Sequence, residues 1–413
     1  MSMSWWWRGA IGATRRRQDE HATATTERRP FQSVALVVGC TGIVGASLVD
    51  ILPLPDTPGG PWKVYALSRR PLPPWWQYRH PPSSSSSVVT HLQVDLTDSA
   101  AVAKTLTPLT DITHVFYAAL SAPSTVDEAK NREANSAMLR SVLAAVVPNC
   151  PRLRHVCLQT GTKHYMGPPA SFGRRTTAHD PPYTEDMPRL DWPNFYYDQE
   201  DVLLDAVAAG AGAVTWSVHR PSLVFGFSPR SAMNVVCSLC VYAAICRKDG
   251  VPLQWPGSLG AWEGFSNASD ADLVAEQQVW AAVVDHPMGM AKNEAFNCSN
   301  GDVFRWRQLW PILAGRFGVE WAGYRGEENR VKLVDAMAGK EPVWAEIVEE
   351  SQLVPTQLHE VANWWFVDAL FCAKWEFLDS MNKSKEHGFL GFRNTAKSFD
   401  NWIDKMKACK IVP

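Results

Sequence analysis

The chain of 413 residues has no long hydrophobic run and no marked excess of either charge. Its longest apolar stretch, from Asn234 to Cys246, is shorter than the roughly 20 residues that a membrane-spanning helix needs. Forty basic side chains face 42 acidic ones, which gives a formal net charge of −2. A general binder of nucleic acid or of anionic membranes would need a basic excess. We therefore expect no nucleic-acid partner and no stable membrane insertion.

The sequence also lacks a disulfide framework, because its nine cysteines are odd in number and scattered from Cys40 to Cys409. One Cys-x-x-Cys pair, Cys237 and Cys240, lies inside the apolar stretch, and no second pair of metal ligands is near it in sequence. We predict buried helical thiols and no metal site. Since no secretory leader precedes Phe31, a cytoplasmic location is expected.

Tryptophan is abundant, with 19 copies, and hydrophobic residues make up 46% of the chain. This composition supports a large core, and the length indicates two domains or one domain with a cap. The large flat rings suit an apolar ligand pocket, although most buried tryptophans serve only packing. Residues 1–30, which contain Trp5–Trp7 and Arg15–Arg17, differ from the remainder and are expected to form a loosely docked extension.

Strand and helix patterns alternate regularly from Ser33 onward. Alternation of this kind predicts parallel strands joined by right-handed helical crossovers, hence an α/β fold with a Rossmann-type doubly wound sheet. The expected strands cover residues 34–38, 62–67, 91–94, 112–118, 154–160 and 214–218, and the helices between them 43–51, 134–147 and 197–209.

Helical patterns dominate the second half of the chain. The expected helices there cover residues 232–246, 271–284, 306–317, 343–350 and 398–407. We thus predict an extension (1–30), a Rossmann domain (31–228) and a mostly helical substrate-binding or cap region (229–413) that is partly interleaved with the Rossmann domain.

A glycine motif, Gly39-Cys-Thr-Gly42-Ile-Val-Gly45, follows the first strand and opens the first helix. Glycines there allow a tight turn and a close backbone approach to a pyrophosphate, which binds the free N–H groups at the helix start. A glycine triplet alone is weak evidence, but here a strand, a helix and a second strand surround it. The GxxGxxG spacing favours the short-chain dehydrogenase/reductase version of the fold.

The second strand is followed by Arg69 and Arg70, where an NAD site usually carries an acidic residue for the ribose hydroxyls. Guanidinium groups instead suit the 2′-phosphate of NADP, through charge-assisted hydrogen bonds. Two surface arginines before a proline are common, but their position relative to the glycine loop favours NADP. Asp95, after the third strand, is expected to meet the adenine amino group.

Reductases of this class place a tyrosine hydroxyl and a lysine beside the nicotinamide, normally four residues apart on one helix. Here Glu200 stands four residues after Tyr196, so the lysine must come from elsewhere. The candidate is Lys163, just past the carboxyl end of the fifth strand, where active sites of open α/β sheets lie. Taken by itself, Lys163 would more often be a solvated loop lysine.

Several long motifs make the whole chain resemble the plant progesterone 5β-reductase/iridoid synthase-like family, an atypical branch of the extended short-chain dehydrogenases/reductases. They include VALVVGCTGIVG, LQTGTKHYMGP, NFYYDQED, NEAFNCSNGDVF and MNKSKEHGFLGFRN. The resemblance implies an NADPH-dependent reductase that adds hydride to the C=C bond of enones or enals, such as 3-oxo-Δ4-steroids or 8-oxogeranial. It also implies that Tyr196 and Lys163 are the catalytic pair, that no active-site metal is needed, and that a homodimer is compatible with the chain.

The resemblance further implies a set of binding residues. Cofactor contacts are expected at Gly39, Thr41, Gly42, Ile43, Gly45, Arg69, Arg70, Asp95, Leu96, Ala119, Gln159, Tyr196, Val224, Ser231, Ala232 and Met233. Substrate contacts are expected at Leu120, Phe172 and Phe366. Departures from the family pattern fall on Ala119, Leu120, Thr162, Phe172 and Leu223; they predict a more apolar pocket and leave the preferred enone open.

Two alternatives remain beside the reductase. A non-catalytic NADP(H)-binding regulator would need only the cofactor loop, and the retention of both Tyr196 and Lys163 argues against it. An ordinary short-chain alcohol dehydrogenase or epimerase would need a local proton relay. Glu200 in place of lysine counts against that reading.

Overall fold

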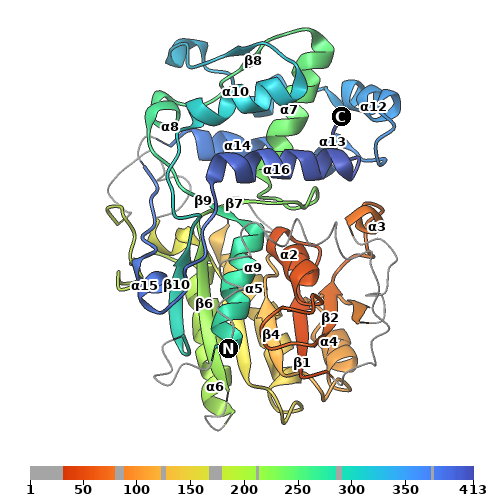
Figure 1. Ribbon diagram of the computed structural model, residues 1–413, viewed down its shortest axis with the longest axis vertical. Helices are drawn as coiled ribbons and strands as arrows, with labels where there is room; N and C mark the ends of the chain where they lie inside the picture. Colours follow the sequence, from red (N-terminus) through yellow and green to blue (C-terminus); the bar gives the residue numbers. More distant parts are fainter. Residues whose placement is uncertain are drawn as a thin grey trace.

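The computed structural model describes residues 31–79, 88–121, 127–166, 179–210, 214–284, 291–373 and 376–413. Two parts are visible in Figure 1, a lower part built on a β-sheet and an upper part built mainly of helices. The predicted extension (1–30) and Phe172 lie outside the described residues.

The lower part is a parallel sheet of seven strands in the order β10-β6-β5-β4-β1-β2-β3. The strands are β1 (Ser33–Val38), β2 (Trp62–Ser68), β3 (Val89–Gln93), β4 (His114–Tyr117), β5 (His155–Gln159), β6 (Thr215–Pro221) and β10 (Glu294–Cys298). All six residues of β1 are buried, as a strand covered on both faces requires. The predicted doubly wound α/β class is confirmed.

Two helical layers cover this sheet. On one face α2 (Ile43–Ile51) packs against α9 (Ala271–Val283), and both lie in front of the strands in Figure 1. On the other face α5 (Glu128–Val146) packs against α4 (Ser99–Leu106) and α6 (Phe195–Ala209). The order of strands places the carboxyl ends of β1 and β4 at the centre of the upper edge.

The upper part centres on α7 (Val235–Asp249), whose first twelve residues are buried. Around it lie α8 (Leu259–Glu263), α10 (Trp306–Phe317), α11 (Leu333–Ala336), α12 (Glu341–Glu350), α13 (Leu358–Val361), α14 (Trp364–Phe371) and α16 (Thr395–Ala408), with the short pair β8 (Leu253–Gln254) and β11 (Trp321–Ala322). The remaining short elements are α3 (Trp76–Arg79), η4 (Glu327–Asn329) and α15 (Asn382–Glu386). No helix in the described ranges is long and apolar enough to cross a membrane.

Most of the tryptophan surplus in this upper part fills its core. The Trp255 ring lies 5.1 Å from the ring centroids of both Trp262 and Trp310, and 4.3 Å from that of Phe371. Trp306 approaches the same Phe371 ring at 4.7 Å. Rings at such distances and at tilted angles pack favourably, so these side chains stabilise the upper part from within.

The thiols predicted to be buried are buried. Cys237 and Cys240 face the core from α7, and all nine cysteines are free, with only Cys372 half-buried. Burial raises the pKa of the Cys237 thiol to about 12. A thiol that is protonated at neutral pH is a poor nucleophile and metal ligand, so the Cys-x-x-Cys pair serves packing.

Two elements of the second half return to the sheet. The strand β10 pairs with β6, and α9 occupies the sheet face beside α2. The helix was predicted as part of a helical half, whereas the strand was not predicted because Glu294 and Asn297 interrupt its short apolar pattern. A second small pair, β7 (Leu223–Phe225) with β9 (Ala268–Asp270), lies between sheet and upper part. The domain boundary at residue 228 stays a prediction.

Candidate active site

The carboxyl ends of the central strands form one continuous edge. Val38 of β1 lies opposite Leu67 of β2 and Tyr117 of β4, and Tyr117 in turn lies opposite Leu158 of β5. The residues that follow these positions therefore emerge side by side, under the upper part (Figure 1). Ligands of open α/β sheets bind at such an edge.

The glycine loop between β1 and α2 leaves no room for a side chain at Gly39 or Gly45. Gly39 has a φ of +89°, and a Cβ there would lie 2.9 Å from the backbone N of Ala119. A Cβ on Gly45 would lie 2.1 Å from the carbonyl oxygen of Gly39. Gly42 precedes α2 and provides no side-chain cap, so the first N–H groups of the helix remain available to an anion. The loop thus fits a dinucleotide pyrophosphate.

The loop after β2 carries Arg69 and Arg70, which are both exposed. Ser68 fixes this loop, because its hydroxyl donates to the carbonyl oxygen of Arg70 at 2.7 Å and lies 2.8 Å from His91 Nε2. Asp95 stands at the neighbouring strand end. The backbone N–H of Thr97 and the charge of Arg69 lower the pKa of the Asp95 carboxyl, against the effect of its partial burial. The guanidinium groups of Arg69 and Arg70 fit the 2′-phosphate of NADP, and the neighbouring carboxylate of Asp95 fits its adenine.

Other predicted cofactor residues lie along the same edge. Gln159 ends β5 and accepts a hydrogen bond from Gln278 of α9 at 3.1 Å. The turn containing Ser231, Ala232 and Met233 follows Ser228, whose hydroxyl donates to the carbonyl oxygen of Thr41 at 2.8 Å. The turn is thereby attached to the glycine loop. Ala119 directly follows β4, Val224 is half-buried on β7, and Leu96 is buried behind Asp95.

The Tyr196 side chain extends from the first turn of α6 to this edge of the sheet. The side chain of Asn194 caps the helix and accepts the N–H of Tyr196 at 3.0 Å. The tyrosine is 9% exposed, and a Cβ on Gly161 would lie 3.2 Å from its hydroxyl oxygen and 3.3 Å from the carbonyl oxygen of Pro221. Its hydroxyl therefore lies at the ends of β5 and β6. Burial, and secondly the charge of Glu128, raise the pKa of Tyr196.

Lys163 lies in the 3₁₀ turn η2 (Thr162–Tyr165), immediately after β5. Its ammonium donates to Glu128 Oε1 at 2.8 Å and lies 4.3 Å from the ring centroid of Phe195. Its backbone carbonyl accepts from Asn194 Nδ2 at 2.9 Å. Asn194 thus links the segment of the lysine to the helix of the tyrosine. Burial lowers the pKa of Lys163, while the hydrogen bond and charge of Glu128 oppose this decrease.

Glu128 was not anticipated from the sequence, in contrast to Tyr196 and Lys163. An acidic residue in the first turn of a helix is an ordinary feature, and 35 residues separate it from the lysine. Glu200, which stands where a lysine is usual, has a separate structural role: it pairs with Arg220 of β6 and with Arg189, each at 3.1 Å. Both contacts turn this carboxylate toward the protein interior.

Of the substrate residues predicted, Leu120 and Phe366 are described. Leu120 follows β4 and is 39% exposed. Phe366 lies in the first turn of α14, where its N–H donates to Asn363 Oδ1 at 3.1 Å. Asn363 also donates to the carbonyl oxygen of Ala232, so the helix of Phe366 is tied to the predicted cofactor turn. Thr162 and Leu223 are half-buried at the starts of η2 and β7.

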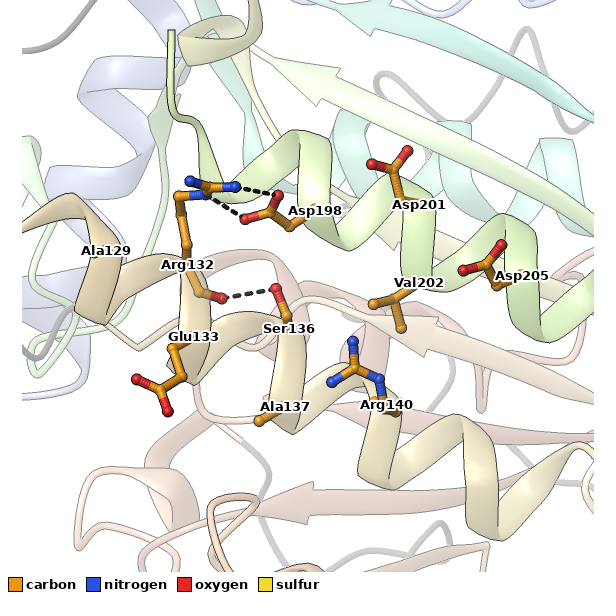
Figure 2. Close-up of a pocket in the computed structure, with 10 residues that line it drawn as sticks. All are labelled: Ala129, Arg132, Glu133, Ser136, Ala137, Arg140, Asp198, Asp201, Val202 and Asp205. Carbon is orange, nitrogen blue, oxygen red and sulfur yellow. Dashed lines mark hydrogen bonds and ion pairs between the residues drawn. The ribbon is translucent and has the colours of Figure 1, made fainter.

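A cavity of about 610 Å³ lies on the outer side of α5 and α6, away from this edge. Figure 2 shows the bidentate pair in which Arg132 donates to Asp198 at 2.6 and 3.0 Å. The lining is largely charged and comprises Ala129, Arg132, Glu133, Ser136, Ala137, Arg140, Asp198, Asp201, Val202 and Asp205. Such a surface does not suit an apolar small molecule.

Solved structures of sugar-nucleotide epimerases share the fold at low sequence identity. UDP-glucose 4-epimerase of Thermotoga maritima superposes with a TM-score of 0.58 at 14% identity, over 91% of this chain and 99% of that one. UDP-glucuronic acid 4-epimerase of Bacillus cereus, in complex with NAD, gives 0.60 at 12% identity, over 90% and 99%. At this identity the likeness concerns the fold alone.

Sequence relatives are much nearer. The (S)-8-oxocitronellyl enol synthase of Nepeta cataria is 55% identical over 411 residues and the 3-oxo-Δ(4,5)-steroid 5β-reductase of Arabidopsis thaliana is 55% identical over 412, with each alignment covering 100% of both chains. Residues 35–413 also match the PRISE-like Rossmann-fold domain family. The resemblance noted in the sequence is therefore confirmed, and the chain belongs to the PRISE-like Rossmann-fold family.

Proposed function

We propose that the protein is an NADPH-dependent reductase of activated C=C bonds in enones and enals. The observation that carries the proposal is the arrangement of Tyr196 and Lys163 at one strand edge, tied together through Asn194 without a lysine one helical turn after the tyrosine. This arrangement departs from that of alcohol dehydrogenases, yet retains a hydroxyl and a cation.

The chain's own residues have separate roles in this chemistry. The glycine loop and Arg69 bind the pyrophosphate and 2′-phosphate of NADPH, which when bound supplies a hydride for the β-carbon of the substrate. The Tyr196 hydroxyl donates a hydrogen bond to the substrate carbonyl oxygen, where negative charge develops. Lys163 adds a positive field from its position behind Phe195. Donors held in place before charge appears stabilise the transition state strongly, as in an oxyanion hole.

The proposed substrates are apolar enones and enals. One named relative is a reductase of 3-oxo-Δ(4,5)-steroids and another is a synthase of 8-oxocitronellyl enol, which supports this class. Leu120, which is 39% exposed after β4, supplies apolar surface at the edge, and Phe366 of α14 is the proposed contact from the upper part, where Asn363 ties its helix to Ala232. Displacing water from such surfaces favours a hydrophobic substrate.

The test is NADPH consumption with progesterone, 2-cyclohexen-1-one and 8-oxogeranial, followed by product analysis. Saturated carbonyl products or their enol-derived products are expected. Allylic alcohols would favour an alcohol dehydrogenase, and tight NADPH binding without turnover across the panel would favour a regulator. Tyr196→Phe is expected to lower turnover strongly while NADPH affinity is retained, since only the hydroxyl is removed. Unchanged turnover would contradict the role assigned to Tyr196.

We also propose that two copies associate through the outer face of α5 and α6 (Figure 2). Asp198 and Asp205 of α6 lie beside Arg132 and Arg140 of α5 on this face, so a two-fold axis would set each acidic row against a basic one. Light scattering after size exclusion should give twice the chain mass, and Asp205→Lys should halve it. A monomer at micromolar concentration would contradict the dimer.

The cytoplasmic location stays a prediction that a fluorescent fusion can test.

A further inference from the structure

Glu128 is placed to influence both members of the proposed catalytic pair. It is the first residue of α5, whose start is capped by Asp127. Its Oε1 accepts from the Lys163 ammonium at 2.8 Å and from the backbone N–H of Phe195 at 3.3 Å. Phe195 immediately precedes Tyr196. One carboxylate oxygen therefore contacts the lysine and also the helix turn that presents the tyrosine.

We propose that Glu128 is a positioning residue that keeps Lys163 charged and Tyr196 protonated, so that the tyrosine acts as a hydrogen-bond donor rather than as a base. This inference rests on the proposed reductase function and assigns it a residue that the cofactor and substrate motifs do not contain. Glu128 acts through Lys163 and Tyr196, and nothing in its contacts requires that it touch the substrate.

The first step of the argument concerns Lys163. The lysine and glutamate side chains are 21% and 23% exposed, so both charges have lost most of their hydration. Burial alone would favour a neutral amine. The hydrogen bond and the opposite charge of Glu128 favour the ammonium form. Among the described residues, no other carboxylate lies within ion-pair distance of Lys163, so its charge depends on this one partner.

The second step concerns Tyr196. In ordinary short-chain dehydrogenases an unpaired lysine favours a phenolate, which can accept a proton from an alcohol. Here the lysine charge is balanced by a carboxylate, and the pKa of Tyr196 is raised by burial and then by that carboxylate. Tyr196 consequently keeps its proton. After hydride has been added to the β-carbon of the substrate, the Tyr196 hydroxyl can stabilise the enolate oxygen by a hydrogen bond. The α-carbon then takes its proton from solvent water.

Most other charged groups around Glu128 bond to other partners. On α5, Lys130 pairs with Asp127 at 3.6 Å, and Arg132 pairs with Asp198 of α6, although the charge of Glu128 also acts on Arg132. On η2, His164 faces Glu200, and burial lowers the pKa of this histidine. The remaining buried groups, Arg220 of β6, Tyr165 of η2 and Tyr197 of α6, bond within that second cluster.

The variant that tests the proposal is Glu128→Gln, which keeps the shape and removes the charge. In Glu128→Gln, kcat and kcat/KM for enone reduction should fall on the alkaline side of their pH profiles at a pH about one unit lower than in the wild type. NADPH affinity should be unchanged. Glu349→Gln is the matched control, because Glu349 is an exposed glutamate on α12 of the upper part, outside the α5/α6 face proposed for dimerisation. Its profile should match that of the wild type, whereas a wild-type profile for Glu128→Gln would overturn the proposal.

Two further measurements separate positioning from mere support of the fold. Glu128→Asp retains a carboxylate with a shorter reach, so its alkaline limit should fall between those of the wild type and Glu128→Gln. In protein labelled with ¹³C at lysine Cε, the NMR signal of Lys163 is identified as the one that disappears in Lys163→Met. This signal should titrate at a lower pH in Glu128→Gln than in the wild type. This titration needs no turnover. If the wild type reduces no enone, the proposed function fails, while an unshifted lysine titration refutes the role of Glu128 by itself.

Discussion

Gly45→Ala is expected to damage the cofactor site, although the same change usually stabilises a helix. In an open helix position, replacing glycine by alanine stabilises by about 0.5–1 kcal/mol. At position 45, the added Cβ would lie 2.1 Å from the carbonyl oxygen of Gly39 and 3.0 Å from Cys40 Cα. These are backbone atoms, and the same oxygen also accepts the N–H of Gly42 at 2.9 Å.

Relief of this overlap requires the glycine loop to move by about 1 Å, and overpacking of this kind typically costs about 1–3 kcal/mol. Net destabilisation of about 0–2.5 kcal/mol remains after the helix gain is subtracted. Since each 1.4 kcal/mol is tenfold in affinity, NADPH binding should weaken by about tenfold if the loop geometry is what binds the pyrophosphate.

The assay is an NADPH titration followed by protein fluorescence, combined with thermal unfolding. Gly315→Ala is the matched control, because Gly315 lies inside α10 with no atom within 4 Å of the added Cβ. The control should unfold at a slightly higher temperature and bind NADPH normally. If Gly45→Ala also became more stable and kept its NADPH affinity, the description of the loop as a close-fitting cradle would be wrong.

Three further predictions concern the arginine corner, the aromatic core and the buried carboxylate. Arg69→Ala should weaken NADPH binding about tenfold more than NADH binding, because only NADPH carries the 2′-phosphate, and equal losses would refute that role. Trp255→Ala should lower the free energy of unfolding by about 3–5 kcal/mol in a denaturant titration, since the ring is 1% exposed at the centre of the aromatic core. His164 and Arg220 outweigh burial and lower the pKa of Glu200 to about 2, so its contribution to stability is present above about pH 4.5 and is lost as the pH falls toward 2. Glu200→Gln should therefore be less stable at neutral pH and should lose stability less steeply in acid; an unchanged slope would contradict this.

The sequence was informative where the signals are local. The glycine loop, the arginine pair and the helix from Ile43 to Ile51 occur within a few residues of one another, and the structure has that helix at the predicted bounds. The third strand was predicted to begin two residues late and to end one residue late, and α4 was not predicted at all. This short helix does have local signals, because Asp98 caps it and its buried residues Val102 and Leu106 lie one helical turn apart, but a helix of this length depends mainly on packing against α5.

The site itself was only partly predictable. Lys163 was found because it follows a predicted strand and matches a family motif, whereas Glu128 has no local signal for its partner. An ion pair across 35 residues depends on how α5 and η2 are placed on the sheet. The same reasoning explains β10, a strand of mixed polarity that forms because the edge of β6 is available to it.

The tryptophans illustrate another limit of composition. The abundance of tryptophan predicted a large core and suited an apolar ligand pocket, and the upper part is indeed rich in aromatic rings. However, Trp255 and Trp310 are buried against each other and leave no face for a ligand. Composition shows how many rings there are, but only the packing shows which of them fill a core. Phe366, a predicted substrate contact, is half-buried and packs against that core.

The return of α9 and β10 to the sheet limits how substrate specificity can be transplanted between relatives. A chimera that exchanges residues 229–413 as one block would also replace a sheet-edge strand and the helix beside α2. It would disturb contacts that cross from this block to earlier residues, such as that of His219 with Gln277 at 2.8 Å and that of the Ser222 N–H with the Ser269 hydroxyl at 2.8 Å. A graft that keeps α9 and β10 with the recipient sheet would instead separate Asp270 from Ser398 and Trp402 of α16, so these partners must be kept together with α9.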